Sequence, residues 1–226
     1  LVAAGVPMDS EYLQHARKMN VLLVQSAALF AQLSKIPIIG VTGTRGKSTV
    51  THMIHHVLTQ ATGEKVLLGG NVRGVSNLQL LKEVEEGSLC VMELDSWQLQ
   101  GFGWAGISPQ IAVFTNFMED HLNYYTRGGK TKEEAMDLYF TDKAQIFLHQ
   151  EDNDVLVTTP EVFKWIKNVL PKATLGQEVI LTDSSIIPEE ALLAMPGEHN
   201  RLNAALAYQA LLATGLTEEE IFSGLA

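Results

Sequence analysis

The chain has 226 residues, of which 46% are hydrophobic and 19% charged, and its formal net charge is −10. So high an apolar fraction with so little net charge per residue excludes an intrinsically disordered chain and indicates one or two globular domains. An acidic chain has no electrostatic reason to bind a nucleic acid backbone, so we exclude nucleic acid as a partner.

The sequence leads us to expect neither a signal peptide nor a membrane span. No apolar run approaches the roughly 20 residues that cross a bilayer, and the start lacks the basic flank of a signal peptide. The single cysteine, Cys90, lies in an apolar run, where we expect a small buried hydrophobe. We therefore expect a cytoplasmic protein without membrane insertion. The chain lacks an initiator methionine and stops after a helical pattern, which is typical of an excised piece.

The predicted elements alternate along the chain. Residues 1–35 contain a helix at 10–18, a strand at 21–24 and a helix at 26–34, which we interpret as the tail of a preceding domain or a docking arm. From residue 36, apolar runs predict strands at 36–41, 65–68, 89–92, 111–114 and 155–157. Helical spacing predicts helices at 48–60, 132–149, 160–170, 199–214 and 218–225, with loops at 126–130 and 183–188. Apolar strands alternating with helices predict an α/β domain with a mostly parallel sheet covered on both faces.

The strongest motif follows the first strand of residues 36–226. It is a glycine-rich turn before a helix, formed by Gly43, Thr44, Arg45, Gly46, Lys47, Ser48 and Thr49. Glycines let backbone N–H groups point inward, the helix N-terminus adds a positive dipole, and a lysine and a hydroxyl can hold phosphate and Mg²⁺. The spacing is G-x-x-G-K-S, tighter than the full Walker A pattern. It predicts a P-loop-type mononucleotide-binding domain over residues 36–226, the alternative being a flexible surface turn.

Two further polar clusters follow predicted strands. Glu93 comes directly after residues 89–92, where a carboxylate can hold a metal ion that bridges nucleotide phosphates, the alternative being that Glu93 or Asp95 caps the next helix. His121 follows residues 111–114 and can ligate a metal or shuttle a proton. A lone histidine is more often structural, but convergence of three strand-end sites favours the functional interpretation.

Three further histidines show metal-ligand spacing. His52, His55 and His56 fall at positions i, i+3 and i+4 of the predicted helix 48–60. No cysteine or acidic residue nearby completes a zinc shell, so we expect a solvated helix face.

Taken together, the ordered motifs resemble the Mur ligase family, the ATP-dependent amide-forming ligases of peptidoglycan synthesis. The resemblance rests on residues 43–49, similar to G-T-N-G-K-S/T; Gly69-Gly70-Asn71, similar to G-G-N; residues 93–99, similar to the E-L-S-S-F-Q-L of the D-glutamate-adding member; residues 116–121, matching N-x-x-x-D-H; and residues 196–203, similar to G-x-H-N-x-x-N.

The resemblance implies a role for each matching residue. Lys47 would bind the β- and γ-phosphates of ATP, while Ser48 or Thr49 and Glu93 would hold Mg²⁺. His121 and Lys143 would serve a second metal, Lys143 after carbamylation to a carboxylate-like group. Asn200 and Asn203 would lie near the adenine, and Asn71, Ser96 and Gln98 would face the nucleotide-sugar substrate.

The same resemblance implies the reaction and its partners. D-Glutamate would be joined to UDP-N-acetylmuramoyl-L-alanine through an acyl phosphate, by a protein of three domains of which this chain would lack the C-terminal, amino-acid-binding one. The chain departs from the family at Arg45, where asparagine is usual, and at Asp95 and Trp97, where serine and phenylalanine are usual. Two alternatives stay open: a folyl- or poly-γ-glutamate synthase-like ligase, and a non-catalytic nucleotide-binding module, in which Glu93, His121 and Lys143 would not converge.

Overall fold

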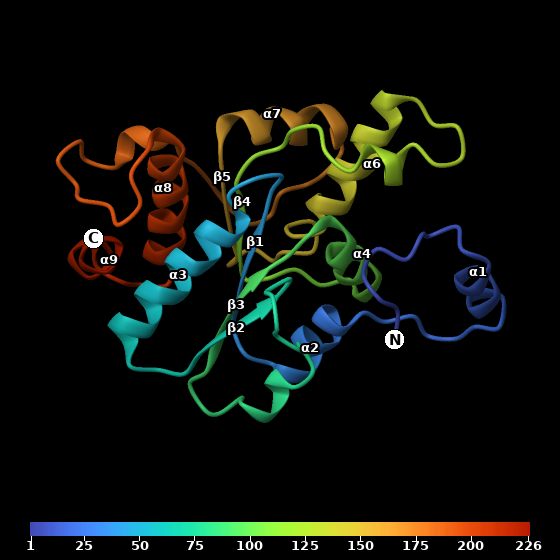
Figure 1. Ribbon diagram of the computed structural model, residues 1–226, viewed down its shortest axis with the longest axis horizontal. Coiled ribbons are helices and arrows are strands. Elements are labelled where there is room, and N and C mark those ends of the chain that lie inside the picture. Colours follow the sequence, from blue (N-terminus) through green and yellow to red (C-terminus); the bar gives the residue numbers. More distant parts are fainter.

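The computed structural model describes residues 1–226 and contains one sheet of six strands, all parallel (Figure 1). The strand order is β2-β3-β1-β4-β5-β6. The strands are β1 (Ile38–Thr42), β2 (Val66–Gly70), β3 (Leu89–Glu93), β4 (Ile111–Phe114), β5 (Val155–Thr158) and β6 (Glu178–Leu181). Because β1 lies between β3 and β4, the glycine-rich loop that follows it is flanked by the carboxyl ends of two other strands.

Helices cover both faces of the sheet, as the sequence predicts. The helices are α1 (Glu11–Lys18), α2 (Ser26–Ser34), α3 (Lys47–Thr62), α4 (Ser96–Ala105), α5 (Leu122–Tyr125), α6 (Lys132–Ala144), α7 (Pro160–Val169), α8 (Glu198–Leu212) and α9 (Glu218–Leu225), with single 3₁₀ turns at η1 (Leu80–Lys82) and η2 (Ser184–Ile186). One buried cluster joins the sheet to α3, α8 and α9, and another joins the opposite face to α2, α4, α6 and α7 (Figure 1).

Capping residues set where several helices begin. Asp95 and Gln98 form a capping box at α4, and Thr131 and Glu134 form another at α6. Thr159 caps α7, whose first residue is Pro160. These local signals fix the start of each helix, and α4 and α7 begin shortly after the carboxyl ends of β3 and β5.

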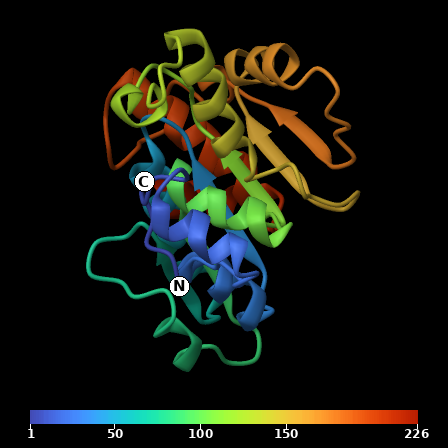
Figure 2. The ribbon, with the colours of Figure 1, turned by 90° about the vertical axis from the view of Figure 1, so that its right-hand side faces the viewer.

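The N-terminal segment differs from the prediction in one element. Residues 21–24 are not a strand: Val21 and Leu22 are exposed, and no strand pairs with them. The following helix α2 buries Ala27, Ala28 and Phe30 in the core, where it packs beside α4 (Figure 2). This packing fits a docking arm, and the assignment of residues 1–35 to a preceding domain stays a prediction.

Other differences concern element ends and a missed strand. The predicted helix 132–149 ends at Ala144, and the chain continues in turns. The sixth strand, β6, was not predicted. Cys90 is completely buried, as expected, and its burial raises the thiol pKa to about 12. No helix in the structure has both the length and the apolar character needed to cross a bilayer.

Candidate active site

The glycine-rich loop joins β1 to α3 and leaves the N-terminus of α3 open. Gly46, the N-cap, adopts a left-handed conformation with φ of 80° and offers no capping side chain, and the first turn contains no acidic residue. The N–H groups of that turn therefore have no partner within the helix and a positive dipole behind them. Ser48 is exposed and Thr49 half-buried on the same turn. This is the geometry of an anion site.

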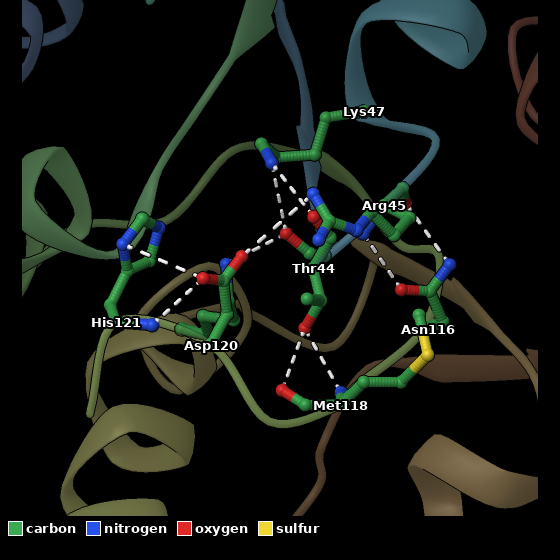
Figure 3. A network of polar contacts seen from close by, with 9 residues as sticks. Thr44, Arg45, Lys47, Asn116, Met118, Asp120 and His121 are labelled. Carbon is green, nitrogen blue, oxygen red and sulfur yellow. Dashed lines mark hydrogen bonds and ion pairs between the residues drawn. The ribbon is translucent and has the colours of Figure 1, made fainter.

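Segment 115–118 after β4 holds the loop in shape (Figure 3). Thr115 Oγ1 donates to the Arg45 carbonyl at 2.6 Å, and Asn116 Oδ1 accepts the Arg45 N–H at 2.9 Å. The Thr44 N–H donates to the Asn116 carbonyl at 3.0 Å, and the Thr44 hydroxyl accepts the Met118 N–H at 3.0 Å. Thr44 therefore fixes the loop with both groups, and its predicted contact with nucleotide stays a prediction.

At two glycines of the loop, neighbouring side chains leave no room for a Cβ atom. Gly43 has a φ of 147°, and a Cβ there would overlap Thr115 Oγ1. A Cβ at Gly46 would lie 2.5 Å from Asn203 Oδ1. Asn203 also donates from Nδ2 to Asn200 Oδ1 at 3.3 Å. The structure thus brings the start of α8, with its two predicted adenine-side residues, against the phosphate loop.

Two lysines converge on one loop carbonyl. The Lys47 ammonium donates to the carbonyl oxygens of Gly43 at 3.1 Å and Thr44 at 3.4 Å. Lys143 Nζ donates to the same Gly43 oxygen at 2.8 Å and lies 4.9 Å from the centre of the Tyr139 ring. Lys143 is only 2% exposed, and this burial, followed by repulsion from Lys47, lowers its pKa to about 7.

Glu93 presents a buried carboxylate beside the loop. It pairs in register with Val41 of β1, and its carbonyl accepts the Asn71 N–H at 2.7 Å. The residue is only 6% exposed, and neither an ion pair nor a hydrogen bond within the protein engages its carboxylate. A carboxylate without a protein partner, at the end of the strand next to β1, suits a hard cation such as Mg²⁺.

His121 lies beside two aromatic rings just before α5, and its side chain is exposed. Its backbone is left-handed, with a φ of 53°, and its N–H donates to Asp120 Oδ1 at 2.8 Å. The imidazole centre lies 4.8 Å from that of Trp97 and 6.0 Å from that of Tyr139. A cavity of about 790 Å³ opens at this point, lined among others by Gly5, Trp97, Asp120, His121, Tyr124 and Arg127.

The three predicted metal residues surround the loop without touching one another. Glu93 lies at the end of β3, His121 is the N-cap of α5, and Lys143 lies near the end of α6. No three His, Cys, Asp or Glu side chains form a group that could hold a metal. Mg²⁺ commonly takes one or two carboxylates and completes its shell with water and phosphate oxygens, so a shared ion stays a proposal.

Two predicted substrate residues have structural contacts on α4. Gln98 donates its N–H to Asp95 Oδ1 at 2.7 Å and accepts the Asp95 N–H on its side chain at 3.4 Å. Asp95 therefore caps the helix, as the alternative interpretation held. Ser96, the first residue of α4, is 1% exposed. Substrate contacts by Ser96 and Gln98 stay predictions.

Sequence reasoning missed a buried polar network next to Lys143. Asp142 Oδ2 accepts from Gln100 Nε2 at 2.7 Å and from the Tyr125 hydroxyl at 2.9 Å. Burial raises the Asp142 pKa to about 6, against the lowering effect of these two hydrogen bonds. Tyr139 was missed as well, although it precedes Lys143 by one helical turn and faces the same side.

The three histidines lie on α3, where the spacing predicts a helix. His52 and His56 are exposed, in agreement with a solvated face. His55 is half-buried, and its Nε2 lies 3.2 Å from the Val66 carbonyl oxygen. Burial lowers the pKa of His55.

A parallel sheet covered on both faces, with a glycine-rich turn leading into an open helix N-terminus, defines a P-loop-type nucleotide-binding fold. Residues 41–182 match the family model of the Mur ligase middle domain. The chain belongs to the Mur ligase family.

Curated relatives agree with this membership. The chain is 31% identical, over 96% of its length, to the UDP-N-acetylmuramoylalanine–D-glutamate ligase of Listeria monocytogenes, and 32% identical over its whole length to that of Sphingopyxis alaskensis. It covers 49% and 50% of these proteins, so the chain spans about half the length of the curated relatives it matches.

Solved structures show the same fold. MurF from Acinetobacter baumannii matches with a TM-score of 0.65 and 20% identity, over 88% of this chain and 48% of that one. Escherichia coli FolC in complex with DHPP and ADP matches with a TM-score of 0.58 and 18% identity, over 100% of this chain and 67% of that one. At these identities the likeness concerns the fold alone.

Proposed function

We propose that this chain is the ATP-binding part of a ligase that joins D-glutamate to UDP-N-acetylmuramoyl-L-alanine. The observation that carries the proposal is the convergence of Lys47 and Lys143 on the Gly43 carbonyl, at the open N-terminus of α3. The Lys47 ammonium and the unpartnered N–H groups of α3 suit the phosphates of a nucleotide, and Lys143 lies beside them. The names of the relatives supply the substrates.

The chemistry proceeds in two displacements. An oxygen of the acid's carboxylate attacks the γ-phosphorus of ATP, a new P–O bond forms, and the bond to the bridging oxygen breaks to release ADP. The amine nitrogen of D-glutamate then attacks the acyl carbon, phosphate leaves with the C–O electron pair, and the nitrogen loses a proton. In the first displacement Lys47 and the α3 N–H groups stabilise the charge on the phosphates.

Glu93, Ser48 and Thr49 would hold a Mg²⁺ ion, and His121 with Lys143 a second one. The ions supply positive charge that offsets the negative charge of the phosphates and acyl phosphate. Within the chain, the hydrogen bond from the His121 N–H to Asp120 and the contact of its ring with the tilted Trp97 ring position the imidazole.

Lys143 would act as a carbamate. With a pKa of about 7, much of its amine is neutral at neutral pH and can attack the carbon of CO₂; an N–C bond forms and one proton leaves the nitrogen. The product carries a negative charge in place of a positive one. The ammonium group would repel a metal ion, whereas a carbamate oxygen can bind one.

The substrates would approach the loop from different sides. Asn200 and Asn203, at the start of α8, would lie near the adenine. The cavity beside His121 and Trp97 has the size to receive the acid, and Ser96 and Gln98 lie with Trp97 on α4. Asn71, which follows β2, would face the same substrate.

The test uses the full-length protein with Mg²⁺-ATP, UDP-N-acetylmuramoyl-L-alanine and D-glutamate, and measures ADP and amide product together. We expect both products from the wild type and neither from Lys47→Ala, because the phosphates lose their mobile cation. Lys172→Ala, an exposed lysine distant in sequence from the motifs, is the matched control and should retain both. A folyl acid offered in place of the nucleotide sugar tests the alternative ligase. ADP formation by Lys47→Ala, or amide formation only with the folyl acid, would contradict the proposal.

A further inference from the structure

Arg45 projects from the phosphate loop on a fixed backbone. Its N–H donates to Asn116 Oδ1 at 2.9 Å, and its carbonyl accepts from Thr115 Oγ1 at 2.6 Å and Asn116 Nδ2 at 3.0 Å. The side chain, by contrast, is 72% exposed and reaches across the loop toward Asp120 (Figure 3). A rigid base with a free end lets the guanidinium change partners without any movement of the loop.

The present partner of Arg45 is a weak one. Arg45 Nη1 lies 3.9 Å from Asp120 Oδ2, which is too long for a hydrogen bond. Exposed ion pairs of this kind contribute little to stability, so the guanidinium can leave Asp120 at small cost. A terminal phosphate carries more charge than a carboxylate and presents three oxygens, which match the planar fork of arginine.

The position of Asp120 indicates where Arg45 points. Asp120 lines the cavity beside His121, which we assign to the acid. The open N-terminus of α3 lies at the loop itself and suits the inner phosphates, which ADP and ATP share. Arg45 thus extends from the loop toward the cavity, across the region where a third phosphate would meet the attacking carboxylate.

We propose that Arg45 is the residue that distinguishes a nucleoside triphosphate from a diphosphate at this site, and that Asp120 competes with the third phosphate for its guanidinium. This inference rests on the proposed nucleotide site. Because Asp120 lies at the cavity, release of Arg45 from it also returns a free carboxylate to the wall of the acid site when the triphosphate binds.

The test measures dissociation constants for Mg²⁺-ADP and for a non-hydrolysable ATP analogue by titration calorimetry. For Arg45→Asn we expect the analogue to bind roughly tenfold more weakly, the loss of one charge-assisted contact, and ADP to change less than about twofold. Asp120→Asn should strengthen analogue binding and leave ADP unchanged, because the competitor is gone. Arg45→Lys keeps the charge without the fork and should recover only part of the preference.

The controls separate this inference from the proposed function. Arg17→Asn removes an exposed arginine of α1 and should change neither constant. An equal loss of ADP and analogue affinity in Arg45→Asn, or no loss of either, would overturn the inference while nucleotide binding stands. A wild type that binds neither nucleotide would overturn the proposed function itself. The unfolding temperature of each variant is measured to detect loss of fold. Because the Arg45 side chain is exposed, we expect its substitution to leave the unfolding temperature unchanged.

Discussion

Lys143 Nζ lies 2.8 Å from the carbonyl oxygen of Gly43, although 100 residues separate the two in the sequence. This contact ties the end of α6 to the tip of β1 across the face of the sheet. It places an amine with a pKa of about 7 in the protein interior. The pH dependence of stability follows from that pKa.

We expect the Lys143 amine to make the protein more stable as the pH rises. The pKa is about 7 in the folded chain and 10.5 ordinarily, so between these values the unfolded chain binds one more proton than the folded one. Stability therefore increases with pH across this window and is lowest below it. In CO₂-free buffer the unfolding temperature of the wild type, relative to Lys143→Met, should rise from about pH 6 to about pH 10.

A matched variant checks the assignment of that slope. Lys172 is exposed, so Lys172→Met should follow the wild type at every pH. A constant difference between wild type and Lys143→Met would show that the Lys143 amine does not change its charge in this range.

The two ends of α3 offer a paired test of the loop. Gly46 and Gly63 are both left-handed, with φ of 80° and 68°, so alanine at either costs about 1–2 kcal/mol of backbone strain. A Cβ at Gly63 meets nothing within 4 Å, whereas one at Gly46 meets Asn203 Oδ1 at 2.5 Å. Chemical denaturation should show a larger loss for Gly46→Ala, and Asn203→Ala should restore part of it. Equal losses in the two single variants would argue against contact between Asn203 and the loop.

Asp142 should show the opposite pH dependence from Lys143. Burial raises its pKa from 3.8 to about 6, so between these values the folded chain binds one more proton than the unfolded one, and stability falls as the pH rises. Asp142→Asn removes this loss and keeps an acceptor for Gln100 and Tyr125. The unfolding temperature of Asp142→Asn relative to the wild type should therefore increase from about pH 4 to about pH 7.

An exposed acid provides the comparison for this measurement. Asp152 is exposed, so Asp152→Asn should show no such trend. If Asp142→Asn and the wild type keep a fixed difference over the same range, the Asp142 carboxyl titrates normally in the folded chain.

Cys90 reports global unfolding. It is the only cysteine, it has no exposed surface, and burial raises its pKa to about 12. Ellman's reagent should find no reactive thiol in the native protein and one per chain in about 6 M guanidinium chloride, because only the exposed thiolate reacts. Rapid labelling of the native protein would show that β3 opens locally.

Local sequence signals account for most of the fold. Strands 111–114 and 155–157 were predicted to within one residue because their apolar runs are buried on both faces. β6 was missed because it lies at the edge of the sheet, where Glu178 and Leu181 are exposed and the apolar run is short. The run at residues 21–24 has the composition of a strand but no partner, which composition alone does not reveal.

The candidate site likewise contains residues that local sequence predicts and residues that only long-range contacts bring together. Residues 43–49 alone predict an anion site, because the strand, the glycines and the start of the helix are contiguous in the chain. The contacts of Asn203 with Gly46 and of Asp142 with Gln100 join residues far apart in sequence, and periodicity carries no information about them. Motif resemblance supplied Asn203, whereas nothing in the sequence pointed to the Asp142 network.

The shared carbonyl of Gly43 makes the loop tolerant of losing one donor. A buried carbonyl stripped of its donor costs roughly 1–3 kcal/mol, which would oppose any departure of Lys47 toward a phosphate. Lys143 donates to the same oxygen, so the Gly43 carbonyl keeps a hydrogen bond when Lys47 moves away. Even an acylated Lys143 nitrogen keeps one hydrogen to donate. The Gly43 carbonyl thus keeps a hydrogen-bond donor when the Lys47 side chain turns away from the loop.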